Sequence, residues 1–562
     1  MKKRNVLAIV LSACIGLTAF AATGCGVGGK KKIDVGDRLE LKVYNFNGGV
    51  GRKWMDAVQA RFEEANKDRV FEISGRKGVV INTNNDGNNI GLENISGRDE
   101  SVYFLEGVHY LDLTDKIVDI SDIVRGENPY ETGKTIESKL SADTKSALSA
   151  HENKYYVLPH YQAYSGIMYN KTLFDKQMLY FAKNVDDYRS QDPNDVEYGF
   201  IKNKTCEKTV GPDGVAGTED DGLPSSIDEF IALCEYMKDK TITPFIYYSA
   251  GGVAHAYQQK LSDALWVNIE GYEGAMAQFK FDSNGQPSSI VTSFDSNDNP
   301  ATKQTVITDQ NAYEMYQQES RYHALRAAQY VFSDAENYHA RSTASSDNHE
   351  IQELFLQGEA AMMLEGTYWL NEATDYGVFN LHPEYKEQDI RFMPLPVQGT
   401  GSVTEGNGKS ATVINIHTSF AFINGNTEKK YGPEVLQVAK EFLQFCYTDE
   451  SLQEFTVKSS STKDLNYTLS SENYNKLDSF AKSIWDIKGA DATGNHVVNT
   501  LSGHPIFVKN STKFDMYNPM IWETEIGFRY PTQAFTPTST TTARSYFEGM
   551  KKSQSWWNSL NR

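Results

Sequence analysis

Cysteine is scarce in this chain, and basic residues are outnumbered by acidic ones. Five cysteines are spread over 562 residues, an odd and sparse set that makes no disulfide framework, although one bridge stays open. Lys and Arg number 55 against 74 Asp and Glu, giving a net charge of −19. An acidic surface repels phosphate backbones and anionic lipid headgroups, so we expect no nucleic-acid partner. Stability must come from apolar cores, and the length allows at least two.

Familiar catalytic signatures are absent as well. The chain has no G-x-S-x-G, no H-E-x-x-H, no Walker loop and no Cys/His spacing suited to zinc. We therefore expect a protein that is not an enzyme and requires no cofactor. Paired carboxylates for glycoside hydrolysis come together only in space, so a glycan-active hydrolase stays open as the alternative.

Long apolar runs are absent except at the start of the chain. Lys2, Lys3 and Arg4 precede an uncharged stretch over residues 6–22, and small residues lead to Cys25 and a Gly/Lys-rich linker. This is the pattern of a secretory signal, and its end resembles the lipobox of bacterial lipoproteins. The prediction is a signal peptide over 1–24, a lipidated Cys25 with a linker over 25–37, and a membrane anchor on an extracellular protein. Cleavage at Cys14 or an uncleaved membrane span are the alternatives.

Alternating strand and helix patterns follow the linker. Strand patterns over Leu39–Phe46, 70–73, 79–81 and Val102–Leu105 surround a helix pattern over 52–66, and residues 82–94 read as a loop. A second such region follows Tyr155 and contains a helix from Ser226, with Glu229 completing a capping box. Asn170 is suited to cap a helix, and Gly358 to end one in a left-handed turn. The alternation predicts an α/β fold.

Four segments carry a family resemblance. They are residues 41–46 with the helix containing Phe62, residues 156–159 leading to 165–174, residues 355–369, and residues 420–424 preceding 439–443. Together they resemble the extracellular solute-binding proteins of carbohydrate ABC transporters, the maltose-binding-protein class. The Tyr-Asn-Lys-x-x-Phe and Phe-x-x-Gly-x-Ala-Ala-Met blocks are the most specific.

The resemblance implies two α/β lobes of the periplasmic-binding-protein type (type II), joined by several hinge crossings, with a carbohydrate held in the cleft between them. We place the crossings near 160–165, 364–367 and 418–423. Lobe 1 would then comprise residues 38–161 and 365–420, and lobe 2 residues 162–364 and 421–562. The protein would be a monomer that delivers a carbohydrate, in our reading an oligosaccharide, to ABC transporter permease subunits.

Sugar recognition needs flat aromatic rings beside amide, carboxylate and hydroxyl groups. Residues of these types near expected strand ends and crossings are the ligand-binding candidates: Asn45, Asn47, Glu106, His160, Tyr161, Tyr247, Trp266, Glu365, Tyr368 and Trp369. Core packing is the competing interpretation of each aromatic residue and is as well supported for Trp266. For Trp369, which follows a predicted crossing, the cleft is favoured.

An acidic, glycine-rich loop precedes the Ser226 helix. Its carboxylates Asp213, Glu219, Asp220 and Asp221 alternate with glycines that allow a tightly wrapped backbone, which suits a structural Ca²⁺ without matching EF-hand spacing. A solvated turn beside a helix N-terminus is the alternative.

Replacing Cys25 by Ala tests the predicted anchor. Because lipidation needs the thiol, we expect the variant to accumulate as an uncleaved precursor or to appear in the medium. Fractionation with mass spectrometry of the mature N-terminus measures this, and Cys14→Ala is the matched control. A normally lipidated Cys25→Ala protein would move the anchor to Cys14.

Overall fold

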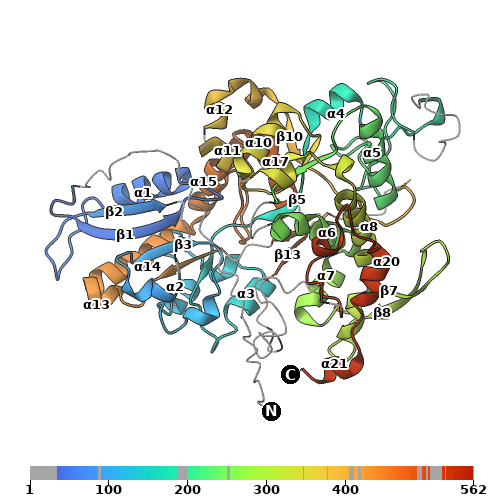
Figure 1. Ribbon diagram of the computed structural model, residues 1–562. Coiled ribbons are helices and arrows are strands. Elements are labelled where there is room, and N and C mark those ends of the chain that lie inside the picture. The colour runs from blue at the N-terminus through green and yellow to red at the C-terminus, as the bar shows by residue number, and fades with distance from the viewer. Residues whose placement is uncertain are drawn as a thin grey trace, which may run out of the picture.

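The computed structural model places the chain in two lobes, each built on its own β-sheet (Figure 1). Described are residues 34–86, 90, 92–187, 199–249, 254–345, 347–375, 377–403, 411–415, 419–489, 496–500, 504, 506, 522–525 and 527–560. Cys25 and the signal segment lie outside the described residues. No helix of the described part is both long and apolar enough to cross a membrane.

The sheet of lobe 1 has the strand order β2-β1-β3-β12-β4. It consists of β1 (Leu39–Phe46), β2 (Val79–Asp86), β3 (Val102–Leu105), β4 (Leu158–Pro159) and β12 (Phe420–Ile423). Strand β1 runs parallel to β2 and β3, whereas β12 is antiparallel to β3 and β4. Its helices are α1 (Lys53–Ala65), α2 (Ser121–Arg125), α3 (Ala142–Leu148), α13 (Thr427–Tyr431), α14 (Pro433–Cys446) and α15 (Asp449–Ser459).

The sheet of lobe 2 has the order β13-β11-β5-β9-β6, with β10 pairing on β5. Its strands are β5 (Tyr164–Asn170), β6 (Phe245–Tyr247), β9 (Met362–Gly366), β10 (Ile390–Phe392), β11 (Thr412–Asn415) and β13 (His496–Asn499). Around it lie α4 (Lys171–Gln177), α5 (Ile227–Asp239), α6 (Ala254–Glu270), α7 (Tyr272–Lys280), α8 (Glu319–Ser333), α9 (Arg341–Ala344), α10 (Asn348–Gln357), α11 (Trp369–Asp375), α12 (Val378–Leu381) and α17 (Ser479–Gly489).

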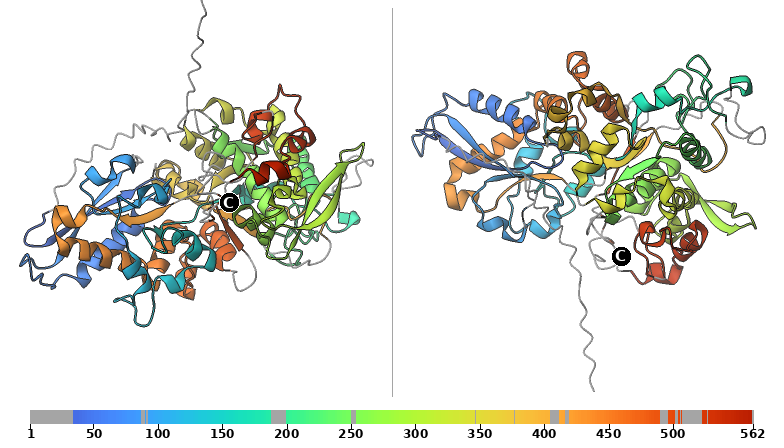
Figure 2. Two further views of the ribbon diagram at one scale, coloured as in Figure 1. Left: turned by 90° about the horizontal axis from the view of Figure 1, so that it is seen from below. Right: turned by 45° about the horizontal axis from the view of Figure 1, so that its top comes forward.

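Two further parts belong to lobe 2. The hairpin of β7 (Pro287–Phe294) and β8 (Pro300–Val306) projects from its edge, and the C-terminal helices α19 (Pro531–Ala534), α20 (Ala543–Gly549) and α21 (Gln554–Asn558) pack on its outside (Figure 2). Helix α16 (Ser471–Asn475) lies near α15. The two lobes separate clearly in both views of Figure 2.

The two-lobed α/β architecture confirms the predicted fold class, but the predicted boundaries differ from the structure. The described residues between 367 and 415 stay in lobe 2, because β10 and β11 pair with β5. Residues 420–459 return to lobe 1, where β12 pairs with β3 and α14 and α15 cover the sheet. The chain therefore crosses between β4 and β5, between β11 and β12, and between α15 and α17. The crossing predicted at 364–367 is wrong, since β9 lies within the lobe 2 sheet.

Several local predictions can be compared directly with the structure. Ser226 accepts a hydrogen bond from the Glu229 N–H at 3.1 Å, and Asn170 accepts one from the Leu173 N–H at 3.0 Å. Gly358 ends α10 with φ +85°. The strand expected at 70–73 is absent, because Val70 makes only an isolated bridge to Lys77. Strand β2 instead extends to Asp86 by pairing with β1 along its full length.

Four of the predicted ligand-binding aromatic residues lie in the cores of the lobes, where a solute in the interlobe space would not reach them. Trp266 is fully buried, donates from Nε1 to Gln318 at 3.0 Å, and packs beside Arg321 and Trp522. Tyr247 packs on Phe332 and Tyr338. These predictions are wrong, because strand-end position alone does not say which way a side chain turns.

Trp369 and His160 are the other two. Trp369 is fully buried between α10 and α17, with Phe355 and Phe480 at ring-centroid distances of 6.0 and 5.5 Å. His160 lies 5.0 Å from both Trp54 and Phe104 within lobe 1. The interlobe position predicted for Trp369 is therefore wrong, whereas His160 lies on the predicted crossing from β4 to β5 with its ring turned into lobe 1.

Replacing Trp369 by Ala should lower the free energy of unfolding by about 3–5 kcal/mol, the usual cost of deleting a fully buried aromatic side chain. Denaturant unfolding measures the change. Leu381→Ala, at a side chain that is 76% exposed in the same lobe, should alter stability by less than about 0.5 kcal/mol. Equal stability of the Trp369 variant and the parent would contradict the core assignment.

Candidate functional site

The carboxyl ends of the parallel strands in both sheets point at the space between the lobes. In lobe 1, β1 and β3 end there, as does β4, which is antiparallel to β12. In lobe 2, β9 and β11 are both antiparallel to β5. Strand β6 is parallel to β9, and β13 is parallel to β11, so these four strands end on the same side. Loops at carboxyl ends of such strands are where open α/β sheets bind ligands. We therefore place the candidate site between the lobes.

Lobe 1 contributes the loop after β1 and the carboxylate after β3. Asn45 donates from Nδ2 to the Gly51 carbonyl at 3.3 Å and to Asn85 Oδ1 at 2.9 Å, which shapes the loop. The Oδ1 atoms of Asn45 and Asn47 are buried and, within the described part of the chain, accept no hydrogen bond. Buried acceptors without partners are unusual and are candidates for contact with a ligand or water.

Tyr161, on the crossing from β4 to β5, and Glu106 both lie close to Gly49. A Cβ built on Gly49 would lie 2.6 Å from Tyr161 Oη and 2.7 Å from Glu106 Oε1. The φ of +66° at Gly49 and this lack of space both require glycine. The loop after β1 thus lies close to both the Glu106 carboxylate and the crossing.

Lobe 2 contributes a buried cluster around Lys260 on α6. Its Nζ lies 2.8 Å from Glu365 Oε1, donates to Tyr368 Oη at 2.9 Å, and lies 3.9 Å above the Tyr257 ring. Burial raises the pKa of the Tyr257 and Tyr368 hydroxyls well above 10, so both keep their protons. The negative charge of Glu106 adds to both shifts, which places that lobe 1 carboxylate within electrostatic reach of the cluster.

Glu372 on α11 is a further part of this cluster. Burial, together with the charges of Glu365 and Glu106, raises its pKa to about 8, although the charge of Lys260 opposes this shift. Gln352 donates to Glu372 Oε2 at 3.0 Å. At neutral pH the Glu372 side chain is therefore a carboxylic acid that donates as well as accepts.

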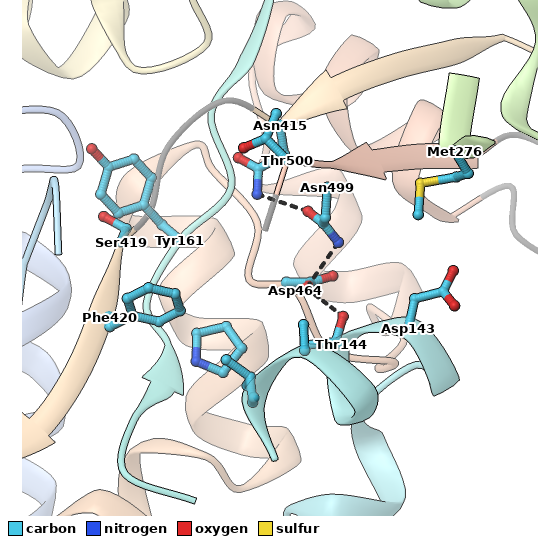
Figure 3. A pocket seen from close by; sticks show the side chains of 13 residues that line it. Asp143, Thr144, Tyr161, Met276, Asn415, Ser419, Phe420, Asp464, Asn499 and Thr500 are labelled. Atoms are coloured by element: carbon cyan, nitrogen blue, oxygen red, sulfur yellow. Dashed lines mark hydrogen bonds between the residues drawn. The ribbon is translucent and has the colours of Figure 1, made fainter. Parts of the chain in front are cut away.

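On the other side of the crossings, the lobes enclose a cavity of about 40 Å³ (Figure 3). Its lining includes Tyr161 and Ser419 from the crossings, Thr144 from α3, and Met276 from α7. A hydrogen-bonded chain joins the segments: Thr144 donates to Asp464 at 2.7 Å, Asn499 to Asp464 at 3.0 Å, and Asn415 to Asn499 at 2.9 Å. This volume holds only a few water molecules, whereas small-molecule sites are typically about 300–1,000 Å³.

Direct contacts hold the lobes together in this arrangement. Asp143 of α3 accepts from Tyr272 Oη at 2.6 Å and from Lys280 Nζ at 2.7 Å, both on α7 of lobe 2. Asn371 of α11 donates to the Ser459 carbonyl of α15. The structure is therefore a closed form in which both lobes share one polar interface.

Lys463, on the crossing after α15, ties that crossing to the first one. Its Nζ donates to the His160 carbonyl at 2.6 Å, and the side chain is almost fully buried beside the rings of Phe455 and Tyr447, 4.2 and 5.1 Å away. Burial lowers the Lys463 pKa to about 7. This contact fixes the relative position of two crossings.

Of the ten predicted ligand-binding residues, the structure therefore brings Asn45, Asn47, Glu106, Tyr161, Glu365 and Tyr368 to the interlobe site. Sequence reasoning missed Tyr257, Lys260, Glu372, Asp143, Asp464 and Asn415. Lys260 offered one signal, a lone cation in a helix of mixed polarity. The others carry no local pattern, because crossings and strand pairing alone bring them to the interface.

The acidic loop does not gather its four carboxylates. Asp213 accepts from the Val215 N–H at 2.7 Å, and Asp221 from the Gly217 N–H at 2.8 Å. Glu219 pairs with Arg391, and burial raises the pKa of Asp220 to about 6. In the described residues, no group of three or more His, Cys, Asp or Glu side chains is arranged to hold a metal ion. The calcium hypothesis gains no support from this geometry.

Two α/β lobes whose strand ends face each other are typical of two-lobed binding proteins. The sequence identifies the family. The pattern of the bacterial extracellular solute-binding proteins matches residues 48–453, so the chain belongs to that family. A comparison with curated proteins finds no match.

Solved structures of similar fold include a chitin oligosaccharide binding protein, with 15% identity and a TM-score of 0.49 over 93% of this chain and 100% of that one. Another is the solute-binding protein RafE in complex with raffinose, at 13% identity and a TM-score of 0.45 over 89% and 99% of the two chains. A family 1 extracellular solute-binding protein from Bifidobacterium longum subsp. infantis gives 12% identity and a TM-score of 0.44 over 93% and 100%.

The raised pKa of Glu372 predicts a pH effect on stability. Between about pH 4.3, where an unfolded Glu ionises, and pH 8, the folded state holds a proton that the unfolded state has lost, so stability falls as pH rises. Glu372→Gln should thus stabilise the protein at pH 8 by on the order of 1–3 kcal/mol and change it little at pH 4.5. Urea unfolding at both pH values measures this, with the exposed Glu387→Gln as control. An equal effect at both pH values would contradict the assigned proton.

Proposed function

We propose that this protein captures a neutral carbohydrate between its lobes and delivers it to an ATP-driven importer. The observation that carries the proposal is that Glu106 of lobe 1, beside Tyr161 of the first crossing, lies within electrostatic reach of the buried cluster of lobe 2. That cluster consists of Tyr257, Lys260 and Tyr368. Carboxylate, amide and protonated hydroxyl groups suit sugar hydroxyls, which both donate and accept. Tyr368 and Tyr257 add ring surface for the C–H faces of a sugar.

Family membership supports this proposal over the hydrolase alternative, since the matched family consists of solute-binding proteins. Two of the solved structures of similar fold have sugars in their names: RafE in complex with raffinose, and a chitin oligosaccharide binding protein. We further propose that the protein acts without catalysis, as a monomer tethered outside the cell through a lipid on Cys25, and that permease subunits receive the closed, loaded form.

Binding in this site requires the lobes to move. The contacts of Asp143 and Asn371 already join the two lobes, so we infer that the solute enters a more open form and that closure follows. A ligand shifts this equilibrium only by as much as it binds the closed form better, which contacts to both lobes provide.

Titration with an oligosaccharide array, read by tryptophan fluorescence and calorimetry, tests the proposal. A bound sugar recovered unchanged supports a binding protein, whereas hydrolysis products would favour the hydrolase. Glu106→Gln and Tyr161→Phe should each weaken binding of the identified sugar by about 1–3 kcal/mol, the usual scale for hydrogen bonds to charged or buried groups. The control is Tyr385→Phe, a half-buried tyrosine stacked on His382 in lobe 2. Unaltered affinity in both site variants would place the ligand elsewhere.

The interlobe contacts of Asp143 predict a separate effect on closure. Asp143→Asn weakens the attraction to Lys280, so the unliganded protein should populate the open form more and bind sugar about 2–5-fold more weakly, in keeping with about 0.5–1 kcal/mol for a partly exposed ion pair. Small-angle scattering of the unliganded protein and calorimetry measure the two effects. Asp115→Asn, an exposed substitution in the same lobe, is the control. An unchanged scattering profile together with weaker binding would make Asp143 a ligand contact instead.

A further inference from the structure

A second cavity, the outer groove, lies on lobe 2 and shares none of its lining with the interlobe site. Its volume is about 510 Å³, within the range of about 300–1,000 Å³ typical of small-molecule sites. The start of α5, one face of α8, the turn of the β7–β8 hairpin and residues 542–544 form its walls. We propose that the outer groove is a second binding site, for a neutral carbohydrate, that operates independently of the interlobe site.

Both arginines that line the groove are paired with carboxylates of the protein. Arg326 donates from Nη2 to Asp228 Oδ1 at 2.5 Å, and Arg544 donates from Nη1 to Asp298 Oδ1 at 2.8 Å. Each guanidinium thus already has a carboxylate partner. An anionic ligand would compete with those carboxylates and would also meet the Asp334 carboxylate, so the charge pattern disfavours an anion and is compatible with an uncharged ligand.

Side chains around these two ion pairs can still form hydrogen bonds with a ligand. In the part of the chain that the structure describes, Oδ2 of Asp228, of Asp298 and of Asp334 accepts no hydrogen bond, since each carboxylate uses only Oδ1. Gln329 accepts from the Ala543 N–H at 2.7 Å through Oε1, which leaves its Nε2 as a donor. Sugar hydroxyls can satisfy acceptors and donors of this kind at the same time.

Asn337 differs from the surface carboxylates of the groove because its side chain is buried. Its side chain is 1% exposed and donates from Nδ2 to the Tyr330 carbonyl at 2.7 Å. Its Oδ1 is buried and, over the described residues, has no partner. A lining residue with an unsatisfied buried acceptor costs stability unless something in the groove donates to it.

The outer groove also gives the C-terminal segment a role. Residues 542–544 lie beyond the range matched by the family pattern, 48–453. Helix α20 nevertheless packs on α8 and closes one wall of the groove, with Ala543 bonded to Gln329. The groove therefore depends on a part of the chain that the family pattern does not cover.

Calorimetric titration with maltohexaose, cellohexaose, xylohexaose and N-acetylchitohexaose up to millimolar concentration tests this inference. The interlobe site is disabled by Glu106→Ala with Tyr161→Ala, and the groove is filled by Ser333→Trp, at a half-buried α8 position that makes no side-chain hydrogen bond among the described residues. The matched control is Glu336→Trp, which adds an indole outside the lining. We expect the disabled variant to bind one equivalent, Ser333→Trp to weaken that binding at least tenfold, and Glu336→Trp to leave it unchanged.

The outcomes separate the two sites. The parent protein could bind one equivalent that the Glu106/Tyr161 variant no longer binds. This result would overturn the proposed site in the outer groove and leave the interlobe proposal standing. One equivalent lost only with Ser333→Trp would support the groove and overturn the interlobe proposal. Binding of calcium or sulfate in the groove, with no hexasaccharide bound there, would also overturn the inference. If thermal melting shows that Ser333→Trp unfolds the protein, Asp334→Ala, which removes one exposed carboxylate, takes its place.

Discussion

Pairing of β12 with both β3 and β4 is the interaction on which the interlobe site depends. Phe420 lies opposite Leu105 and Pro159, so the segment returning from lobe 2 enters the lobe 1 sheet where β4 leaves it. This fixes Glu106, Tyr161 and Ser419 at one edge. Since β5 starts within five residues of the end of β4, the lobe 2 sheet must present its own strand ends close by.

The resulting interface is polar, and burial sets its chemistry. Lys260 keeps a partner in Glu365, whereas Glu372 becomes neutral because burial, and then the nearby charge of Glu365, raises its pKa. Among the described residues Lys463 has no carboxylate partner, and it is held by a carbonyl and aromatic rings. The site thus contains protonated hydroxyl and carboxyl groups beside amides, a combination suited to uncharged polyols. Closure excludes water from this surface, and the contacts of Asp143 show that closure also has interactions of its own.

The two cavities differ in the parts of the chain that form them. The interlobe space changes volume as the lobes move, so its ligand contacts come from both sheets at once. The outer groove is framed by α5, α8, a hairpin turn and the C-terminal segment of one lobe, and lobe movement leaves it unchanged. Its ion pairs are satisfied internally, which leaves hydrogen bonding rather than charge as the basis of recognition.

Local sequence patterns determined the parts of this protein that depend on neighbouring residues. The Ser226 and Asn170 caps and the Gly358 helix end follow from side-chain and backbone preferences within a few positions. Strand ends rich in Asn, Glu and Tyr likewise indicated Asn47, Glu106, Tyr161 and Tyr368. Periodicity gave the α/β class, and the family motifs indicated the two lobes.

Tertiary structure alone decided the boundary of each lobe and the direction of each aromatic side chain. The described residues between 367 and 415 belong to lobe 2 because β10 and β11 pair with β5, and no local sequence pattern identifies the partner of a strand. Trp369 and Tyr368 are adjacent in sequence, yet Trp369 begins a helix packed on α10 and α17 while the Tyr368 hydroxyl meets Lys260. Pairing and packing join residues that are hundreds of positions apart, and their energies depend on which surfaces meet rather than on which residues are neighbours in the chain.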